Sequence, residues 1–275
     1  MHLPNPAFVY GTAWKEDRTA ALTLAALEVG FRAVDTANQR KHYLEVGVGE
    51  ALRQAFDRGL TTRDAVWIQT MFTFQAGQDH RLPYDPSAPI AEQVAQSVAS
   101  SLDHLGLRYL DSLILHGPGQ RHGLGDADLE AWAALERALK AGHTLAIGVS
   151  NVSASQLSEL CTRAAVTPHH AQIRTFARAD WEAELRAVCS RYSITYQGFS
   201  LLTANREVWG GPVVARIAAS HQITPAQVMY AFARQSGMLP LMGSTDRTHL
   251  AEALASLELT LAPSELDEIQ RSGRP

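Results

Sequence analysis

Between Ser112 and Asn151 the sequence runs SLILHGPGQRHGLGDADLEAWAALERALKAGHTLAIGVSN. It begins with a short apolar run, SLILHG, and ends with another, TLAIGVSN. Between them, Leu129–Ala141 has the amphipathic pattern of a helix, and Gly142 suits the position that ends one. Apolar runs without polar alternation are typical of strands buried on both faces of a parallel sheet. The segment therefore predicts one strand–helix–strand unit.

The same alternation extends over the whole chain. Six further apolar runs predict strands: FVYGTA (8–13), RAVDTA (32–37), AVWIQTM (65–71), HAQIRT (170–175), ITYQGFSLL (194–202) and LPLMGST (239–245). Helical patterns lie at 17–29, 48–58, 91–105, 129–141, 153–163, 181–191, 210–220 and 225–236, with a terminal helix at 264–270.

Strict alternation of strands and helices predicts a parallel α/β sheet. Eight such units favour closure into a (β/α)8 TIM barrel, and an open doubly wound sheet is the alternative. The chain has 275 residues, close to the roughly 250 typical of one such barrel. We therefore expect a single domain over residues 1–275.

Composition excludes several classes of partner. The net charge is −4 with acids and bases interspersed, which argues against nucleic acid as the main partner. No apolar run approaches the ~20 residues of a membrane span. The two cysteines make no disulfide framework, and the N-terminus MHLPNPAFVYG lacks the pattern of a signal peptide. We expect a cytoplasmic protein that is a monomer or a small homo-oligomer.

Polar residues fall where the predicted strands end. They are Asp35, His116, Ser150, Asn151, Gly243, Ser244 and Thr245, and Gln172 lies within the sixth predicted strand. In a barrel these carboxyl ends converge on one mouth, where active sites are built. Taken singly, each has an ordinary explanation, such as a helix cap for Asp35 or a solvated histidine for His116. Their recurrence at successive strand ends favours an active site.

Other familiar sites are not indicated. The sequence has no GxGxxG after a strand, no Cys/His cluster with zinc spacing and no GxSxG nucleophile elbow. The longest predicted loop, residues 73–89, is rich in Pro, Gly and Asp and follows the third strand. A long loop on this face is expected to carry function.

Several segments together resemble the aldo-keto reductases. They are DTANQRKHYLEVGVGEAL, IQTMFT, LDSLILHGP, IGVSN and HHAQIR, in that order and spacing over nearly the whole chain. The resemblance implies a barrel that reduces aldehydes and ketones with a nicotinamide dinucleotide, usually NADPH. A barrel isomerase or lyase without nicotinamide is disfavoured by the Ser150, Asn151 and Gln172 set.

The resemblance also assigns the groups that transfer the proton. Asp35 and His116 match the family's aspartate and histidine, which support the acid and orient the carbonyl. Arg40 stands five residues after Asp35, where the family pattern has its tyrosine. Tyr43 is the only tyrosine of this loop, and we assign it the role of proton donor. The alternative is that Tyr43 packs at the start of the following helix.

The family's lysine is replaced by Met71 at the end of the third strand. Lys15 and Lys41 do not stand at that strand end, although either side chain could reach over it. Without a neighbouring cation, Tyr43 is expected to be a poor acid and Asp35 to have a raised pKa. The chain should then bind cofactor but reduce carbonyls slowly, whether Met71 is engineered or natural. A cofactor-binding regulatory protein without turnover is the alternative function.

For the cofactor, the resemblance implies contacts along the mouth. Ser150, Asn151 and Gln172 match the residues that hold the nicotinamide carboxamide, and Phe199 matches the aromatic on which the ring stacks. The other expected contacts are Gly11, Thr12, Ala13, Asp35, Ser200, Leu202, Thr203, Gly243, Ser244, Thr245, Arg247, His249 and Glu252. Arg247 is the expected partner of a 2′-phosphate, so we expect NADPH rather than NADH.

The expected substrate pocket is aromatic. Trp14, Tyr43, Phe72, Phe74, His116 and Trp209 are its predicted lining. Such walls suit an apolar or aromatic carbonyl compound. For Trp14 and Phe72, ordinary packing at the barrel rim is the alternative.

Overall fold

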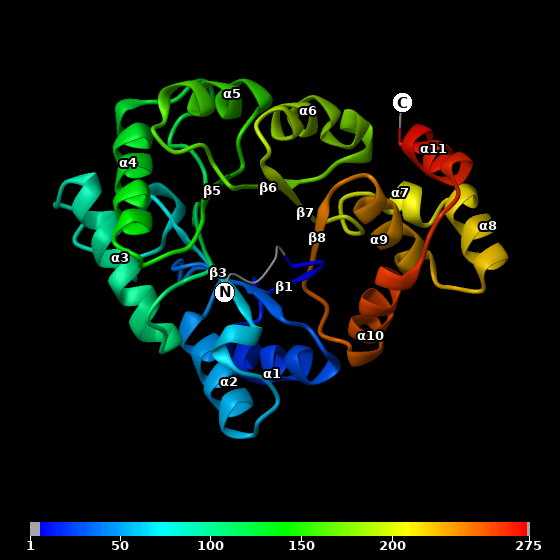
Figure 1. Ribbon diagram of the computed structural model, residues 1–275, viewed down its shortest axis with the longest axis horizontal. Helices are drawn as coiled ribbons and strands as arrows, with labels where there is room; N and C mark the ends of the chain where they lie inside the picture. The colour runs from blue at the N-terminus through cyan, green and yellow to red at the C-terminus, as the bar shows by residue number, and fades with distance from the viewer. Residues whose placement is uncertain (1–5, 274–275) are drawn as a thin grey trace.

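The computed structural model describes residues 6–273 and contains a closed barrel of parallel strands, each paired with the next and β8 paired with β1. The strands are β1 (Val9–Gly11), β2 (Ala33–Asp35), β3 (Trp67–Phe72), β4 (Ser112–Leu115), β5 (Ile147–Ser150), β6 (His170–Arg174), β7 (Thr195–Phe199) and β8 (Leu239–Met242). Figure 1 shows the helices arranged around this ring. The predicted (β/α)8 barrel is confirmed, and the open sheet is excluded. Residues 1–5 and 274–275 of the predicted domain lie outside the described residues.

The helices cover the outside of the barrel. They are α1 (Thr19–Val29), α2 (Glu45–Asp57), α3 (Ile90–Leu105), α4 (Asp126–Lys140), α5 (Ala154–Arg163), α6 (Ala183–Arg191), α7 (Arg206–Trp209), α8 (Pro212–His221), α9 (Pro225–Gln235), α10 (Arg247–Ala255) and α11 (Pro263–Ser272). Short 3-10 turns lie at Glu16–Arg18, Arg63–Ala65, Gln75–Gly77, Ala177–Glu182 and Ser256–Glu258. Within residues 6–273, no helix has the length and apolar character needed to cross a membrane.

Local sequence signals account for many helix ends. Ser153 and Thr224 accept hydrogen bonds from the backbone of the first turns of α5 and α9, as N-cap residues do. Gly106 ends α3 with a φ of +66°, a left-handed conformation that favours glycine. The sequence did not predict α7 or α10. The cap of α10 is Asp246, whose carboxylate accepts from the amides of Thr248 and His249.

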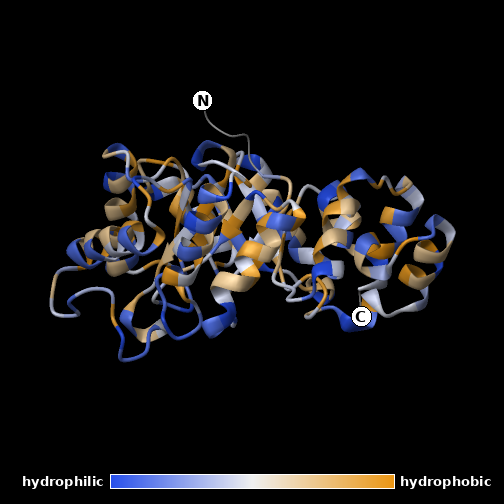
Figure 2. Cartoon of the chain, turned by 90° about the horizontal axis from the view of Figure 1, so that it is seen from below, coloured by the Kyte–Doolittle hydropathy of each residue, from blue (hydrophilic) through white to orange (hydrophobic). Residues whose placement is uncertain are grey.

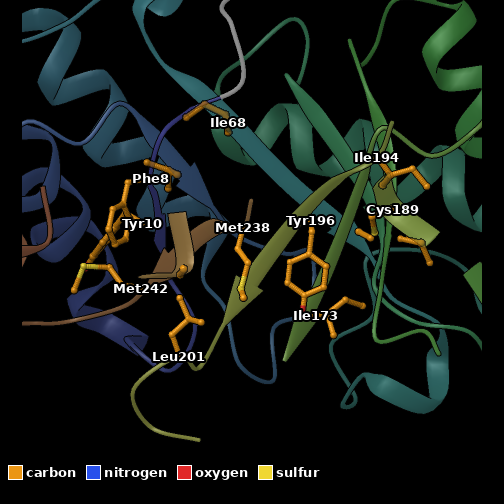
Figure 3. Close-up of a cluster of buried hydrophobic side chains, with 14 of the residues drawn as sticks. Phe8, Tyr10, Ile68, Ile173, Cys189, Ile194, Tyr196, Leu201, Met238 and Met242 are labelled. Carbon is orange, nitrogen blue, oxygen red and sulfur yellow. The ribbon is translucent and has the colours of Figure 1, made fainter. Parts of the chain in front are cut away.

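The main hydrophobic core lies between the barrel and its helices. Figure 3 shows part of it, including Phe8 and Tyr10 near the start of the chain and Tyr196 on β7. Apolar and polar residues alternate along the helices in Figure 2, as expected for helices with one face on the core. This packing fixes the strand ends that carry the candidate site.

The barrel interior is built in layers. Near the strand starts, Val9, Ala33, Trp67 and Leu239 form one buried apolar cluster. Near the strand ends, Ala37, Met71 and Ile114 form another, with Tyr43 packed against it. A layer of buried polar side chains, described below, lies between them. Barrel interiors are usually filled by branched apolar residues, so this polar layer is unusual.

Candidate active site

A pocket of about 950 Å³ opens at the carboxyl ends of the strands. Most of the predicted site residues line it: Gly11, Ala13, Trp14, Asp35, Tyr43, His116, Ser150, Asn151, Gln172, Phe199, Ser200, Leu202, Thr203, Trp209, Gly243, Ser244, Thr245, His249 and Glu252. The predicted convergence of polar residues from successive strand ends is therefore observed in the structure.

Five predicted residues lie outside the lining: Thr12, Met71, Phe72, Phe74 and Arg247. Thr12 is fully buried, and its hydroxyl donates to the backbone carbonyl of Asp35 at 2.9 Å. It therefore ties β1 to β2 and does not face a ligand.

The prediction that Phe72 and Phe74 line the pocket was wrong. Successive residues of a strand point to opposite faces, and Met71 points into the barrel. Phe72 therefore points outward into the main core, where its ring packs 5.3 Å from that of Phe74 and 5.6 Å from that of Tyr84. For Phe72, the packing alternative is the one observed.

Asp35 is 2% exposed at the end of β2 and has two neutral partners. Its Oδ1 accepts from Nε2 of Gln69 at 2.7 Å and from Nε2 of Gln172 at 2.9 Å. Burial raises the pKa of Asp35 to about 7, although the two hydrogen bonds lower it. The raised pKa agrees with the direction expected for a carboxyl group without a cation.

Gln69, Gln172 and Gln197 complete the polar layer around Asp35. Gln69 and Gln197 exchange two hydrogen bonds of 2.9 Å, and Gln172 donates to Oε1 of Gln197 at 3.3 Å. Nε2 of Gln172 donates to both Asp35 and Gln197. Because Gln172 lines the pocket, its Oε1 can accept a hydrogen bond from a ligand there. Sequence reasoning found Gln172 but missed Gln69 and Gln197, which lie on buried apolar strands.

Tyr43 lies between the pocket and the apolar cluster that contains Met71. Its ring centre is 6.0 Å from that of His116. Burial, and then the charge of Asp35, raise the pKa of Tyr43 well above its usual range. Met71 is fully buried and offers no charge that would oppose this. The tyrosine is thus placed beside Asp35 and His116 but is a weak acid.

His116 is held from one side by the long loop of residues 73–89. Its Nδ1 lies 2.7 Å from the hydroxyl of Thr73. Burial lowers the pKa of His116 to about 4, so the ring is neutral near pH 7. If the Thr73 hydroxyl donates to Nδ1, the ring hydrogen is on Nε2, the atom free to meet a ligand.

The same loop is anchored to the β2–α2 segment. Gln78 donates to the carbonyl of Asn38 at 2.8 Å, and Gln39 donates to the carbonyl of Gly77 at 2.7 Å. Tyr84 donates to the carbonyl of Thr73 at 2.8 Å. The loop therefore fixes Thr73, which is the part of it that contacts a site residue.

Arg247 faces away from the pocket. Its Nη1 lies 2.7 Å from Oε2 of Glu28, whose other oxygen pairs with Arg58 at 2.8 Å. The two arginines lower the pKa of Glu28 through their hydrogen bonds. Arg247 does not line the pocket, and its contact with a cofactor phosphate stays a prediction.

Neither lysine considered in the sequence reaches the place of Met71. Lys41 is exposed and outside the lining. Lys15 is 3% exposed, and its ammonium donates to the carbonyl of Gly243 at 2.8 Å, on the β8 side of the pocket. Burial, and then the charge of Arg18, lower the pKa of Lys15 to about 8.

Further lining residues were not predicted: Lys15, Arg174, Leu201, Thr224, Pro225, Ala226, Tyr230, Leu241 and Met242. The period of two along a strand could have found Arg174, because it follows Gln172 on the same face of β6. Within residues 6–273, no group of three or more His, Cys, Asp and Glu side chains could hold a metal ion.

Comparison with known proteins agrees with this architecture. The Aldo/keto reductase family profile matches residues 6–205. An aldo-keto reductase of Mycobacterium avium is 29% identical over 255 residues, covering 93% of this chain and 81% of that protein. The aldo-keto reductase MGS-M4 from a deep-sea metagenome shares the fold with a TM-score of 0.84 and 22% identity, over 98% of this chain and 92% of its own. A Bombyx mori aldo-keto reductase solved in complex with NADP has a TM-score of 0.82 and 22% identity, over 99% and 92%.

Proposed function

This chain belongs to the aldo/keto reductase family, and on that premise we propose that it reduces an aldehyde or ketone to an alcohol with a nicotinamide dinucleotide. One observation carries the proposal. Asp35, Tyr43 and His116 share a pocket with the free amide oxygen of Gln172. The pocket volume of about 950 Å³ lies at the upper end of the roughly 300–1,000 Å³ of ligand sites.

The nicotinamide end of the pocket fits a carboxamide. Gln172 offers Oε1 as an acceptor. Asn151 donates through Nδ2 to the carbonyl of His116 at 2.8 Å, which leaves its Oδ1 free. Phe199 adds an aromatic face to the same wall. A reduced nicotinamide ring, when bound, supplies the hydride.

The rest of the pocket suits the remainder of a dinucleotide. Lys15 offers an ammonium beside Gly243, and Ser200, Leu202 and Thr203 line the wall after β7. Glu252 and His249 lie at the far end, on α10. Because Arg247 faces Glu28, the expected choice of NADPH loses its main support.

Tyr43 and His116 supply the hydrogen-bond donors for the substrate oxygen. The neutral His116 ring donates from Nε2 and orients the carbonyl. Hydride adds to the carbonyl carbon, the π electrons move to the oxygen, and the oxygen takes the hydroxyl proton of Tyr43. Solvent at the pocket mouth then returns a proton to Tyr43.

Met71 makes this proton transfer slow. A cation beside Tyr43 would lower its pKa, whereas the thioether leaves it raised. This feature also favours the second candidate function, a nicotinamide-dinucleotide-binding protein without turnover. The retained Asp35, Tyr43 and His116 favour the reductase.

The substrate side of the pocket is lined by Trp14, Tyr43 and Trp209. Trp14 is 70% exposed and contacts His42, with ring centres 3.9 Å apart and the two planes tilted by 37°. These walls suit an apolar or aromatic carbonyl compound. The single domain over 1–275, the cytoplasmic location and the oligomeric state stay predictions.

The proposal is tested by nucleotide titration followed by turnover. Reduced nicotinamide dinucleotides should quench tryptophan fluorescence, because Trp14 and Trp209 line the pocket. Nucleotide oxidation is then followed with a panel of aldehydes. Tyr43→Phe should lower turnover by at least about 100-fold without changing the Kd of the nucleotide. Absence of binding would contradict both candidates, and binding without oxidation, also in Met71→Lys, would favour the second.

A further inference from the structure

The wall of the pocket at the end of β6 carries a cation that the proposed reaction does not use. Arg174, the last residue of β6, lines the pocket and has an exposed side chain. It follows Gln172 on the same face of the strand, so it stands two residues, or roughly 7 Å, nearer the mouth. An arginine side chain keeps its charge throughout the ordinary pH range.

Arg174 has an aromatic neighbour and no acidic partner. Its guanidinium carbon lies 5.3 Å from the centre of the Phe176 ring, and that of Arg178 lies 4.7 Å from the same ring. Neither belongs to the arginines of residues 6–273 that form ion pairs, which are Arg58, Arg63, Arg81, Arg163, Arg216, Arg247 and Arg271. Of the two guanidinium groups on Phe176, that of Arg174 belongs to the pocket lining. It is therefore available to an anion in the pocket.

The place of Arg174 in the barrel separates it from the phosphates of the cofactor. Strands β6, β7 and β8 follow one another around the ring (Figure 1), and Arg174 is the register partner of Phe199 at the end of β7. The dinucleotide proposed above extends from Phe199 towards β8 and α10, so Arg174 lies on the other side of the nicotinamide ring. In that binding mode the carboxamide lies on the same side as Arg174. Because the carboxamide is attached next to the ring carbon that gives the hydride, a group beside it can reach the substrate.

The same part of the barrel holds one group that orients the reacting carbonyl. His116 directly follows β4, and Asn151, directly after β5, donates to the backbone carbonyl of His116 at 2.8 Å. Two strand spacings, roughly 10 Å in all, separate β4 from β6. A substrate of about the size of one aromatic ring, together with the long side chain of Arg174, covers this distance.

We infer that the substrate is an apolar or aromatic carbonyl compound that also carries a carboxylate, and that Arg174 binds this carboxylate. The inference rests on the proposed function. A guanidinium presents two parallel N–H donors to the two oxygens of a carboxylate, and a neutral group cannot replace this contact. Phe176 supports the guanidinium from one side. Arg174 thus selects the substrate and takes no part in the transfer of the hydride or the proton.

The test compares 4-formylbenzoate with 4-formylbenzamide, which share the ring and the aldehyde and differ in charge. Each is titrated calorimetrically into the protein saturated with an oxidised nicotinamide dinucleotide, which cannot reduce it. The carboxylate compound should bind at least about tenfold more tightly, and added salt should shrink this ratio. Equal affinity for the two compounds overturns the inference alone. Failure of both NAD and NADP dinucleotides to bind overturns the proposed function and the inference with it, so the two failures are distinguishable.

Two variants assign the preference to Arg174. Arg174→Met keeps an unbranched side chain and removes the charge, and it should weaken the binding of 4-formylbenzoate about tenfold. The affinities for 4-formylbenzamide and for the nucleotide should stay within about twofold, because neither ligand offers a carboxylate to this side chain. Arg178→Met is the matched control, since it removes the other guanidinium on Phe176 from outside the pocket lining. It should change the affinity for 4-formylbenzoate by less than about threefold, as expected for an exposed charge without direct contact.

Two results from these variants would overturn the inference. Equal losses of 4-formylbenzoate binding in Arg174→Met and Arg178→Met would mean that the overall charge of this surface attracts the carboxylate. Weaker nucleotide binding in Arg174→Met, with both aldehydes unaffected, would assign the guanidinium to a phosphate of the cofactor.

Discussion

Gln69 and Gln197 lie on opposite sides of the barrel, on β3 and β7, and their amides exchange two hydrogen bonds of 2.9 Å through its interior. Where Asp35 is ionised, it determines the direction of these amides, because a carboxylate without a proton can only accept. Gln69 and Gln172 must therefore turn Nε2 towards Asp35. The hydrogen bonds among Asp35, Gln69 and Gln197 in the barrel interior thus determine how the Gln172 amide is oriented towards the pocket.

Removing Gln69 should destabilise the barrel. Gln69→Leu keeps a similar volume but takes the acceptor from the buried Nε2 of Gln197 and one donor from Asp35. We expect the free energy of unfolding to fall by about 1–3 kcal/mol, measured by urea denaturation.

The double variant Gln69→Leu/Gln197→Leu is the control. It removes both partners of the exchanged pair, so its loss should be smaller than the sum of the two single losses. Strict additivity would mean that the two amides do not stabilise each other.

Met71→Lys should raise carbonyl reduction by at least about tenfold, a fraction of the roughly 10²–10⁴-fold that acid catalysis typically contributes. The ammonium would stand beside Tyr43 and within the reach of Asp35, lowering the pKa of both groups. Met71→Leu, which adds no charge, should leave the rate unchanged. The rate is followed by the loss of reduced-nicotinamide absorbance, and equal rates in the two variants would refute the account of this position.

Asp35 should make stability depend on pH. Its pKa is about 7 in the folded protein and near ~3.9 when unfolded, so the folded state binds the proton more tightly. This contribution is complete below about pH 4 and is lost as pH rises through 7. His116 and His170, with lowered pKa values, act in the opposite direction, so the comparison must be with Asp35→Asn.

The measurement is the free energy of unfolding of both proteins at a series of pH values. The stability of the wild type relative to Asp35→Asn should decline between pH 4 and 7 and then stay level. A difference that does not vary with pH would show that Asp35 keeps an ordinary pKa.

Thr73 should act through His116. Thr73→Val removes the hydroxyl that lies 2.7 Å from Nδ1, so the His116 ring loses its hydrogen-bond partner at that nitrogen. We expect kcat/KM for a carbonyl substrate to fall about tenfold, with the Kd of the nucleotide unchanged. Thr73→Ser keeps the hydroxyl and should retain most of the activity. A matching loss in both variants would point to packing and not to the hydrogen bond.

The fold could be predicted because strand and helix periods alternate clearly and Gly106 and similar residues mark helix ends. The location of the candidate site at the carboxyl ends of the strands could be predicted because polar residues such as Asp35 and His116 stand at the ends of apolar runs. The polar layer could not, since Gln69 is a single polar residue within an otherwise buried strand. The ion pair of Arg247 could not be predicted, because its partner Glu28 lies 219 positions earlier in the chain.

Trp14 combines a large exposed indole with a left-handed backbone, at a φ of 62°, and its ring contacts that of His42 at the pocket mouth. A β-branched or bulky residue seldom adopts that conformation without support from its surroundings. The free protein therefore keeps an apolar ring in water. A substrate that covers the indole would release the water that hydrates this ring. Calorimetry would detect this release as a negative heat-capacity change on binding. Trp14 thus makes the arrival of an apolar substrate measurable as heat, independently of any chemistry that follows.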